Sequence, residues 1–204
     1  MPIIYNPITD RKFFYIHIPR TAGRFLVENF IAHGCKIIHP FTNKIITNLK
    51  QANEIVEGVE MLHAHEFIYN RWISVKDLPH FTIIRDPIDR FFSASCCPDK
   101  ELNEQEIEDW DVFNKQISKP YYRNWFRPQH EFISSKTKVW KYEDGFGEDF
   151  CNWISDIVSF PFSIKTDLFT PIKLSKNKLK KTDALLKNIK KYYEKDFKNT
   201  QKEW

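Results

Sequence analysis

The sequence predicts an α/β domain of three layers with a mainly parallel central sheet. Three observations indicate this fold class: candidate strands and helices alternate along the chain, an N-terminal strand runs through a tight turn into a helix, and a later strand does the same. The 204 residues suffice for one domain with a substantial core, so we assign residues 1–204 to a single domain.

The first predicted strand is the aromatic and apolar run that starts at Phe13, after an irregular lead-in over residues 1–12. Pro19 and Gly23 break this run, and the apolar residues that follow recur at helical spacing. They predict a helix that ends near Gly34. The apolar residues of this helix are Phe25, Leu26, Phe30 and Ile31.

The turn between this strand and this helix is a candidate anion site. Strand, turn and helix in this order place free backbone N–H groups at a helix N-terminus, where they attract phosphate and similar anions. Arg20 and Arg24 add positive charge, and Thr21 adds a hydroxyl. The Walker pattern of glycines followed by Lys and Ser or Thr is absent, so an ordinary turn with two solvated arginines is an equal alternative.

The middle of the chain brings two histidines close together in sequence. A short strand is predicted at 35–38 and a helix at 42–58. His63 and His65 follow on one side of an extended segment, 59–67. A polar pair on a half-exposed strand is the simpler interpretation, and two histidines without a third ligand do not make a metal site.

The clearest strand is 80–84, which is β-branched and aromatic. It ends at Arg85 and Asp86, and Pro87 suits the first turn of a helix. Arg85 would then lie at the carboxyl end of a strand, where open α/β sheets bind their ligands. A salt bridge to Asp86 or Asp89 is the alternative role for this arginine.

The C-terminal half completes the alternating pattern. The acidic segment 98–119 predicts a solvated helix, and 120–133 is either a substrate-facing loop or a short packed helix. A strand at 139–142 and a helix at 146–158 follow, and Thr182 can cap a final helix with a solvated lysine-rich face. These lysines could instead form a rim for an acidic acceptor. The residues expected to point inward from the final helix are Leu185, Leu186, Ile189, Tyr192, Tyr193 and Phe197.

The composition favours a soluble globular protein, with 42% hydrophobic and 16% aromatic residues. The net charge of +4 suits a small polyanionic ligand and gives no argument for nucleic acid. The four cysteines lack zinc-ligand spacing, which favours free thiols in a reducing compartment. With no signal peptide and no apolar run long enough to span a membrane, we expect a cytoplasmic protein.

Several motifs occur in a recognisable order along the chain. They are Ile-Pro-Arg-Thr-Ala-Gly at 18–23, His-Ala-His at 63–65, Thr-Ile-Ile-Arg-Asp-Pro-Ile-Asp-Arg-Phe-Phe-Ser at 82–93, Tyr-Glu-Asp at 142–144 and Tyr-x-x-Asp-Phe at 193–197. Through them the chain resembles the PAPS-dependent sulfotransferases, in particular the carbohydrate 2-O-sulfotransferase-like branch. PAPS is the sulfate donor 3′-phosphoadenosine-5′-phosphosulfate.

The resemblance implies a P-loop-like sulfotransferase fold and transfer of a sulfuryl group from PAPS to an acceptor hydroxyl, on a carbohydrate, without a metal. His65 would be the catalytic base, His63 would orient it or share its role, and Arg20 would stabilise the leaving group. The donor-binding residues would be Pro19, Arg20, Thr21, Ala22, Gly23 and Arg24 around the 5′-phosphosulfate, and Arg85 and Ser93 at the 3′-phosphate. We expect acceptor contacts from 121–130, which is aromatic and basic.

Two departures from the family pattern leave other functions open. Arg20 stands where the family has lysine, and Arg24 and Phe25 follow where it has Thr or Ser. One alternative is a P-loop-like small-molecule kinase, although the Walker lysine and a magnesium-binding hydroxyl are missing from their usual places. The other is a catalytically inactive homologue that binds a nucleotide or a glycan, which the exchange at Arg20 favours.

Overall fold

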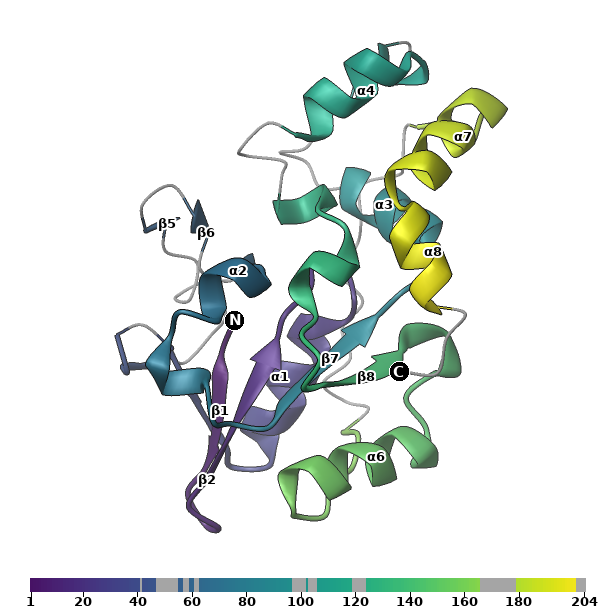
Figure 1. Ribbon diagram of the computed structural model, residues 1–204. Coiled ribbons are helices and arrows are strands. Elements are labelled where there is room, and N and C mark those ends of the chain that lie inside the picture. Colours follow the sequence, from purple (N-terminus) through teal and green to yellow (C-terminus); the bar gives the residue numbers. More distant parts are fainter. Residues whose placement is uncertain are drawn as a thin grey trace.

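The computed structural model contains a six-stranded mixed sheet with helices packed on both faces (Figure 1). It describes residues 1–40, 42–46, 55–56, 59–60, 63–96, 102, 106–118, 124–165 and 179–200. A separate two-stranded sheet pairs β5 (Ile55–Val56) with β6 (Val59–Glu60). The strands of the larger sheet are, in spatial order, β4 (Ile45–Ile46), β3 (Lys36–Ile38), β1 (Ile3–Asn6), β2 (Arg11–Ile16), β7 (His80–Ile84) and β8 (Thr137–Lys141).

Parallel pairing in this sheet is confined to β2, β7 and β8, while β1, β3 and β4 add antiparallel pairings. The predicted α/β class is therefore confirmed, but the prediction of a mainly parallel sheet is wrong. The reason lies in the lead-in 1–12, which is not irregular: β1 and β2 form a hairpin in which Ile3 faces Phe14. A short turn can join only antiparallel strands, so this hairpin makes half of the sheet antiparallel.

One face of the sheet is covered by α1 (Gly23–Ala32) and α6 (Glu148–Val158). Their apolar residues pack with alternate residues of β2 and β7, among them Phe13, Tyr15 and Phe81. Both helices confirm the sequence predictions to within two residues. Tyr15 and Phe81, on neighbouring parallel strands, stack with their ring centres 5.2 Å apart.

The opposite face carries shorter elements: α2 (Glu66–Tyr69), η3 (Ile73–Val75) and η5 (Gln129–Phe132). Tyr69 holds two of them together, because its hydroxyl donates a hydrogen bond of 2.6 Å to the carbonyl oxygen of Phe132. Its ring also meets Phe14 of β2 edge-on, with ring centres 5.2 Å apart. Sheet and helices thus form three layers.

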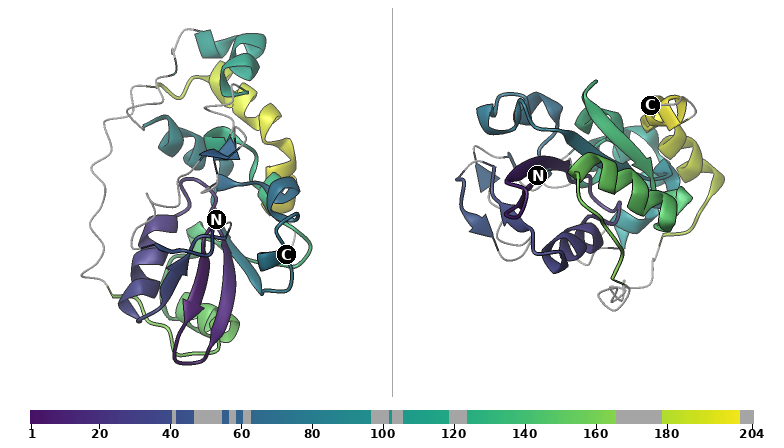
Figure 2. Two further views of the ribbon diagram at one scale, coloured as in Figure 1. Left: turned by 90° about the vertical axis from the view of Figure 1, so that its left-hand side faces the viewer. Right: turned by 90° about the horizontal axis from the view of Figure 1, so that it is seen from below.

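A further group of helices packs beyond the carboxyl end of β7, at the opposite end of the molecule from α6 (Figures 1 and 2). Its centre is Arg90, whose side chain is fully buried and lies 5.3 Å from the centre of the Tyr193 ring. The predicted cap at Thr182 is confirmed by its hydrogen bond with the Leu185 amide. The elements of this group are α3 (Pro87–Ser95), η4 (Glu106–Glu108), α4 (Trp110–Ile117), α7 (Asp183–Tyr192) and α8 (Glu194–Thr200).

Two predictions for the middle of the chain are wrong where the structure describes it. The helix expected at 42–58 is replaced by β4 and β5, and the extended segment at 59–67 ends in α2. Ile46 pairs with Ile37 of β3, so pairing with the preceding strand decides the conformation of an apolar run that also fits helical spacing. Residues 47–54, 57–58 and 61–62 lie outside the described residues.

The other predicted elements agree with the structure. Strands at 35–38, 80–84 and 139–142 correspond to β3, β7 and β8, and Pro87 opens α3. The acidic segment 98–119 contains α4 in its described part. In the part of the chain that the structure describes, no helix combines the length and apolar character needed to cross a membrane.

Candidate functional site

Three residues of the predicted motifs lie in the segments that follow the three parallel strands. Arg20 comes after β2, Arg85 after β7 and Tyr142 after β8. Because β7 lies between β2 and β8, Arg85 is flanked by the segments that leave both neighbours. This edge is where open α/β sheets bind ligands.

Arg20, Arg85 and Ser93 make contact there, and we call them the arginine cluster. Arg20 Nε donates to Ser93 Oγ at 3.0 Å, and Arg85 Nη1 donates to the carbonyl oxygen of Arg20 at 3.5 Å. The Arg85 guanidinium lies over the ring of Tyr142, 4.5 Å from its centre. The predicted convergence of the Arg20 loop and the Arg85 motif on one face is therefore observed.

The arginine cluster holds positive charge without a counter-charge. Among the described residues, neither guanidinium forms an ion pair with a carboxylate, and the buried Arg85 Nε has no hydrogen-bond partner. The Asp86 carboxylate instead accepts a hydrogen bond from the Asp89 amide at the start of α3. Two half-buried arginines that lack a carboxylate partner and belong to adjoining segments favour a bound anion, which would supply the missing charge and acceptor atoms.

The loop 18–23 between β2 and α1 has a strained backbone. Arg20 and Ala22 have φ angles of 68° and 66°, in the left-handed region that costs a non-glycine residue about 1–2 kcal/mol. Left-handed residues of this kind turn successive N–H groups toward one concave surface. Ala22 gives α1 no side-chain cap, and the first turn of α1 has no acidic residue. The hydroxyl of Thr21 is buried and donates to the Ile18 carbonyl at 2.9 Å, so it braces the loop.

Gly23 approaches His17 so closely that no side chain would fit. A Cβ at Gly23 would lie 1.8 Å from Cδ2 and 1.9 Å from Nε2 of His17. The His17 ring stacks on the ring of His63, with centres 4.9 Å apart and planes at 29°, and the two residues are only 8% and 3% exposed. Trp125 adds a ring 5.5 Å from His63. His17 therefore connects the loop with the histidine segment.

The remaining predicted site residues differ in how far their side chains are exposed. Pro19 is buried, whereas the Arg24 side chain is 65% exposed and pairs with Glu28 at 2.9 Å. His65 precedes α2 and is half-buried, with its ring parallel to that of Phe67 at 6.3 Å. The structure thus joins Arg20 to Arg85 and Ser93, sets His63 beside the loop, and turns Arg24 to the surface.

Sequence reasoning missed His17 because it continues an aromatic and apolar run and reads as part of a strand. The signal that could have marked His17 as a site residue is a polar ring just after the apolar run, six residues before Gly23. It also left 120–133 undecided between a loop and a packed helix. The described part, 124–133, is mostly buried, with a helical turn at 124–126 and η5 at Gln129–Phe132.

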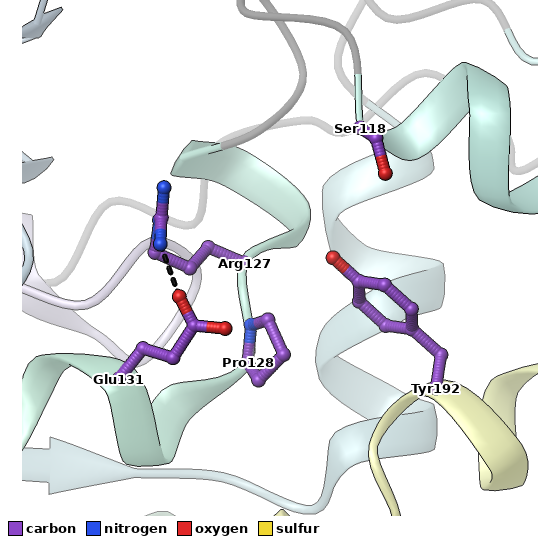
Figure 3. Close-up of a pocket in the computed structure, with 5 residues that line it drawn as sticks. All are labelled: Ser118, Arg127, Pro128, Glu131 and Tyr192. Carbon is purple, nitrogen blue, oxygen red and sulfur yellow. Dashed lines mark hydrogen bonds and ion pairs between the residues drawn. The ribbon is translucent and has the colours of Figure 1, made fainter.

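A pocket of about 250 Å³ lies beside this segment. Figure 3 shows the hydroxyls of Ser118 and Tyr192 on one side of it and the ion pair of Arg127 with Glu131 beyond Pro128. Hydroxyls, an ion pair and an apolar ring make a surface suited to a small polar ligand. Residues 121–123, which we expected to help bind the acceptor, lie outside the described residues.

Comparisons with protein-family models, with curated proteins and with solved structures find no match to this chain. Within the described residues, no group of three or more His, Cys, Asp or Glu side chains is placed to hold a metal ion. Cys35 and Cys151 are free, and burial raises the pKa of the Cys35 thiol to about 11, while the Cys96 thiol donates to the Phe92 carbonyl oxygen at 3.1 Å. The fourth cysteine, Cys97, lies outside the described residues.

Proposed function

We propose that this protein is a sulfotransferase that moves a sulfuryl group from PAPS to a hydroxyl of an acceptor, on a carbohydrate. The observation that carries the proposal is the arginine cluster, in which Arg20 bonds to Ser93, Arg85 approaches the Arg20 carbonyl oxygen, and neither guanidinium pairs with a carboxylate among the described residues. It lies beside an uncapped helix N-terminus at the carboxyl ends of the parallel strands. PAPS carries a phosphosulfate on the 5′ oxygen and a phosphate on the 3′ oxygen of one ribose, so it needs two anion contacts close to each other.

The donor would bind across the arginine cluster. The N–H groups of the loop 18–23 and the Arg20 guanidinium would hold the phosphosulfate, while Arg85 and Ser93 would hold the 3′-phosphate. The hydrogen bond between Arg20 Nε and Ser93 Oγ supports a role for arginine at this position. Arginine can keep Nε on the serine and present its terminal nitrogens to an anion, whereas lysine has a single nitrogen.

The transfer itself needs positioning and charge stabilisation more than covalent help, by analogy with phosphoryl transfer. The acceptor oxygen forms a bond to sulfur while the bond from sulfur to the phosphate oxygen breaks. Arg20 and the loop N–H groups would stabilise the charge that develops on the departing 3′-phosphoadenosine-5′-phosphate, PAP. The acceptor proton would pass to His65, with His63, stacked on His17 beside the loop, orienting or sharing this role.

For the acceptor, the pocket beside Pro128 is the candidate site. It has room for one sugar-sized ring and offers hydroxyl groups from Ser118 and Tyr192. Its lining residues Pro128 and Glu131 flank Gln129, which is hydrogen-bonded to the main chain of Arg85, so pocket and arginine cluster adjoin the same segment.

A kinase remains the rival from another enzyme class. It would need a hydroxyl for magnesium in the loop, but the Thr21 hydroxyl is buried on the Ile18 carbonyl. The inactive homologue shares the donor site and differs only in turnover.

Calorimetric titration with PAP and with ATP, followed by incubation with labelled PAPS and a panel of glycans, lipids and small alcohols, tests the proposal. We expect PAP to bind more tightly than ATP and label to appear in one acceptor class. Tighter binding of ATP would favour the kinase, and PAP binding without transfer to any acceptor would favour the inactive homologue.

A further inference from the structure

We propose that Asp196 of α8, acting through Gln129, is a positioning residue for Arg85. This inference rests on the proposed function, because it assigns Arg85 to the 3′-phosphate of the donor. It gives a role to the closing motif at 193–197, which the donor site leaves unexplained.

The first link joins Gln129 to Arg85. The Gln129 side-chain amide makes two hydrogen bonds with the Arg85 main chain: Oε1 accepts from the Arg85 N–H at 2.9 Å, and Nε2 donates to the Arg85 carbonyl at 2.7 Å. Gln129 is 2% exposed. Both main-chain groups of Arg85, at the point where β7 has ended, are therefore held by one buried side chain.

The second link joins Asp196 to η5. One carboxylate oxygen accepts from the Gln129 N–H at 2.7 Å, and the other accepts from the His130 N–H at 2.9 Å and contacts His130 Nδ1 at 2.7 Å. The Asp196 side chain is 1% exposed, so these are desolvated, charge-assisted hydrogen bonds. They fix the backbone from which the Gln129 side chain extends.

The direction of the Arg85 guanidinium depends on these links because few other contacts restrain it. Among the described residues its side chain contacts the Tyr142 ring at 4.5 Å and the Arg20 carbonyl oxygen at 3.5 Å, and its Nε has no hydrogen-bond partner there. A rotation of the Arg85 backbone would move the guanidinium away from Arg20 and Ser93. Partners that orient a ligating side chain commonly change affinity about 10–100-fold when removed.

The neighbouring residue of the closing motif serves the same segment. The Tyr193 hydroxyl donates to the Phe126 carbonyl at 2.6 Å, just before the residues that Asp196 holds. Tyr193 and Asp196 thus attach the C-terminal helices to the segment that positions Arg85.

The test compares affinities for PAP and for AMP, which is PAP without the 3′-phosphate. We expect Asp196→Asn to lose about tenfold or more in PAP affinity with AMP affinity unchanged, because only the 3′-phosphate contact is disturbed. Glu194→Gln is the matched control, since it removes a carboxylate from the exposed face of the same helix and should alter neither affinity. Gln129→Met keeps the side-chain size and removes both hydrogen bonds to Arg85, so it should cause the same selective loss of PAP affinity. It also tests the link if Asp196→Asn does not fold.

Two affinity results would overturn the inference. Equal losses of PAP and AMP affinity in Asp196→Asn would show a general structural role. An unchanged preference for PAP over AMP would show that Asp196 does not act on Arg85, while leaving the proposed function intact.

If the wild-type protein does not prefer PAP over AMP, the proposed function fails. Amide hydrogen exchange at Arg85 in the free protein then decides the positioning role. Faster exchange at Arg85 in Gln129→Met and Asp196→Asn than in Glu194→Gln supports it, and equal exchange contradicts it.

Discussion

The close approach of Gly23 and His17 allows a sharp test of the candidate site, because it joins the loop 18–23 to His17 and His63. In Gly23→Ala the new Cβ would lie 1.8 Å from Cδ2 of His17, whereas non-bonded carbon atoms prefer about 3.5–4.0 Å. The ring would have to move by roughly 2 Å. Since the ring is buried and stacked on His63, that movement breaks the stack.

The expected change in stability follows from two opposing terms. Overpacking a filled interior costs about 1–3 kcal/mol, and alanine in a helix regains about 0.5–1 kcal/mol relative to glycine. The free energy of unfolding should therefore fall by up to about 2.5 kcal/mol, with a central value near 1 kcal/mol, which lowers Tm by about 2–4 °C in a domain of this size. Turnover should fall as well, because His63 is displaced from the loop.

Urea unfolding followed by circular dichroism measures this loss, and Gly147→Ala provides the control. Gly147 also lies at the start of a helix, but a Cβ there meets no atom within 4 Å. Adding His17→Ala to Gly23→Ala removes the obstructing ring, so the double-mutant cycle should show favourable coupling. A Gly23→Ala protein with the wild-type urea midpoint would refute the close approach.

Three further predictions concern the proposed 3′-phosphate contact of Arg85, the proposed base His65 and the buried His80. Arg85→Ala should weaken PAP binding about 10–100-fold, the loss expected for a charged hydrogen bond. Unchanged PAP affinity in calorimetry would exclude the contact of Arg85 with the 3′-phosphate. His65→Ala should lower turnover in the label-transfer assay by about 10²–10⁴-fold with PAP affinity retained. His33→Ala is the control and should keep near-wild-type turnover. The same near-wild-type turnover in His65→Ala would exclude His65 as the catalytic base. Burial lowers the pKa of His80 in the folded protein. Below about pH 6.5, the pKa of histidine in the unfolded chain, the unfolded state therefore binds more protons than the folded state. The free energy of unfolding then falls as the pH falls. His80→Phe should flatten the dependence of the urea midpoint between about pH 7.5 and 5.5, and an unchanged slope would contradict this assignment.

The elements that were predictable from sequence are those specified by local chemistry. The β-branched run 80–84 and Pro87 define a strand and a helix start without help from the rest of the chain. The resemblance to the sulfotransferases assigned Arg20 and Arg85 to one donor molecule, and the structure places the two arginines near each other, after neighbouring parallel strands. The pairing of those two strands was not predicted from the sequence.

The elements that escaped prediction are too short to be specified by their own residues and depend on the strands or helices they pair with. β1 has four residues and is defined by its pairing with β2 and β3, and β4 has two residues opposite β3. Nothing within such short runs distinguishes strand from helix or loop. Gln129 and Asp196 are 67 residues apart in sequence, so the link between them appears only when α8 packs against η5.

Several unfavourable features of the folded protein lie at the carboxyl ends of the parallel strands. Arg20 and Ala22 occupy left-handed conformations, the Arg20 and Arg85 guanidinium groups have no carboxylate partner among the described residues, and α1 begins without a side-chain cap. Each feature is unfavourable in the free protein, and an anion bound at this place would relieve the last two at once. Strain persists in folded proteins where the surrounding structure enforces it, and here Thr21, Gln129 and Asp196 provide that support through buried hydrogen bonds. If the arginines are held ready for the donor in this way, PAP should raise the Tm of the wild-type protein more than it raises that of Asp196→Asn.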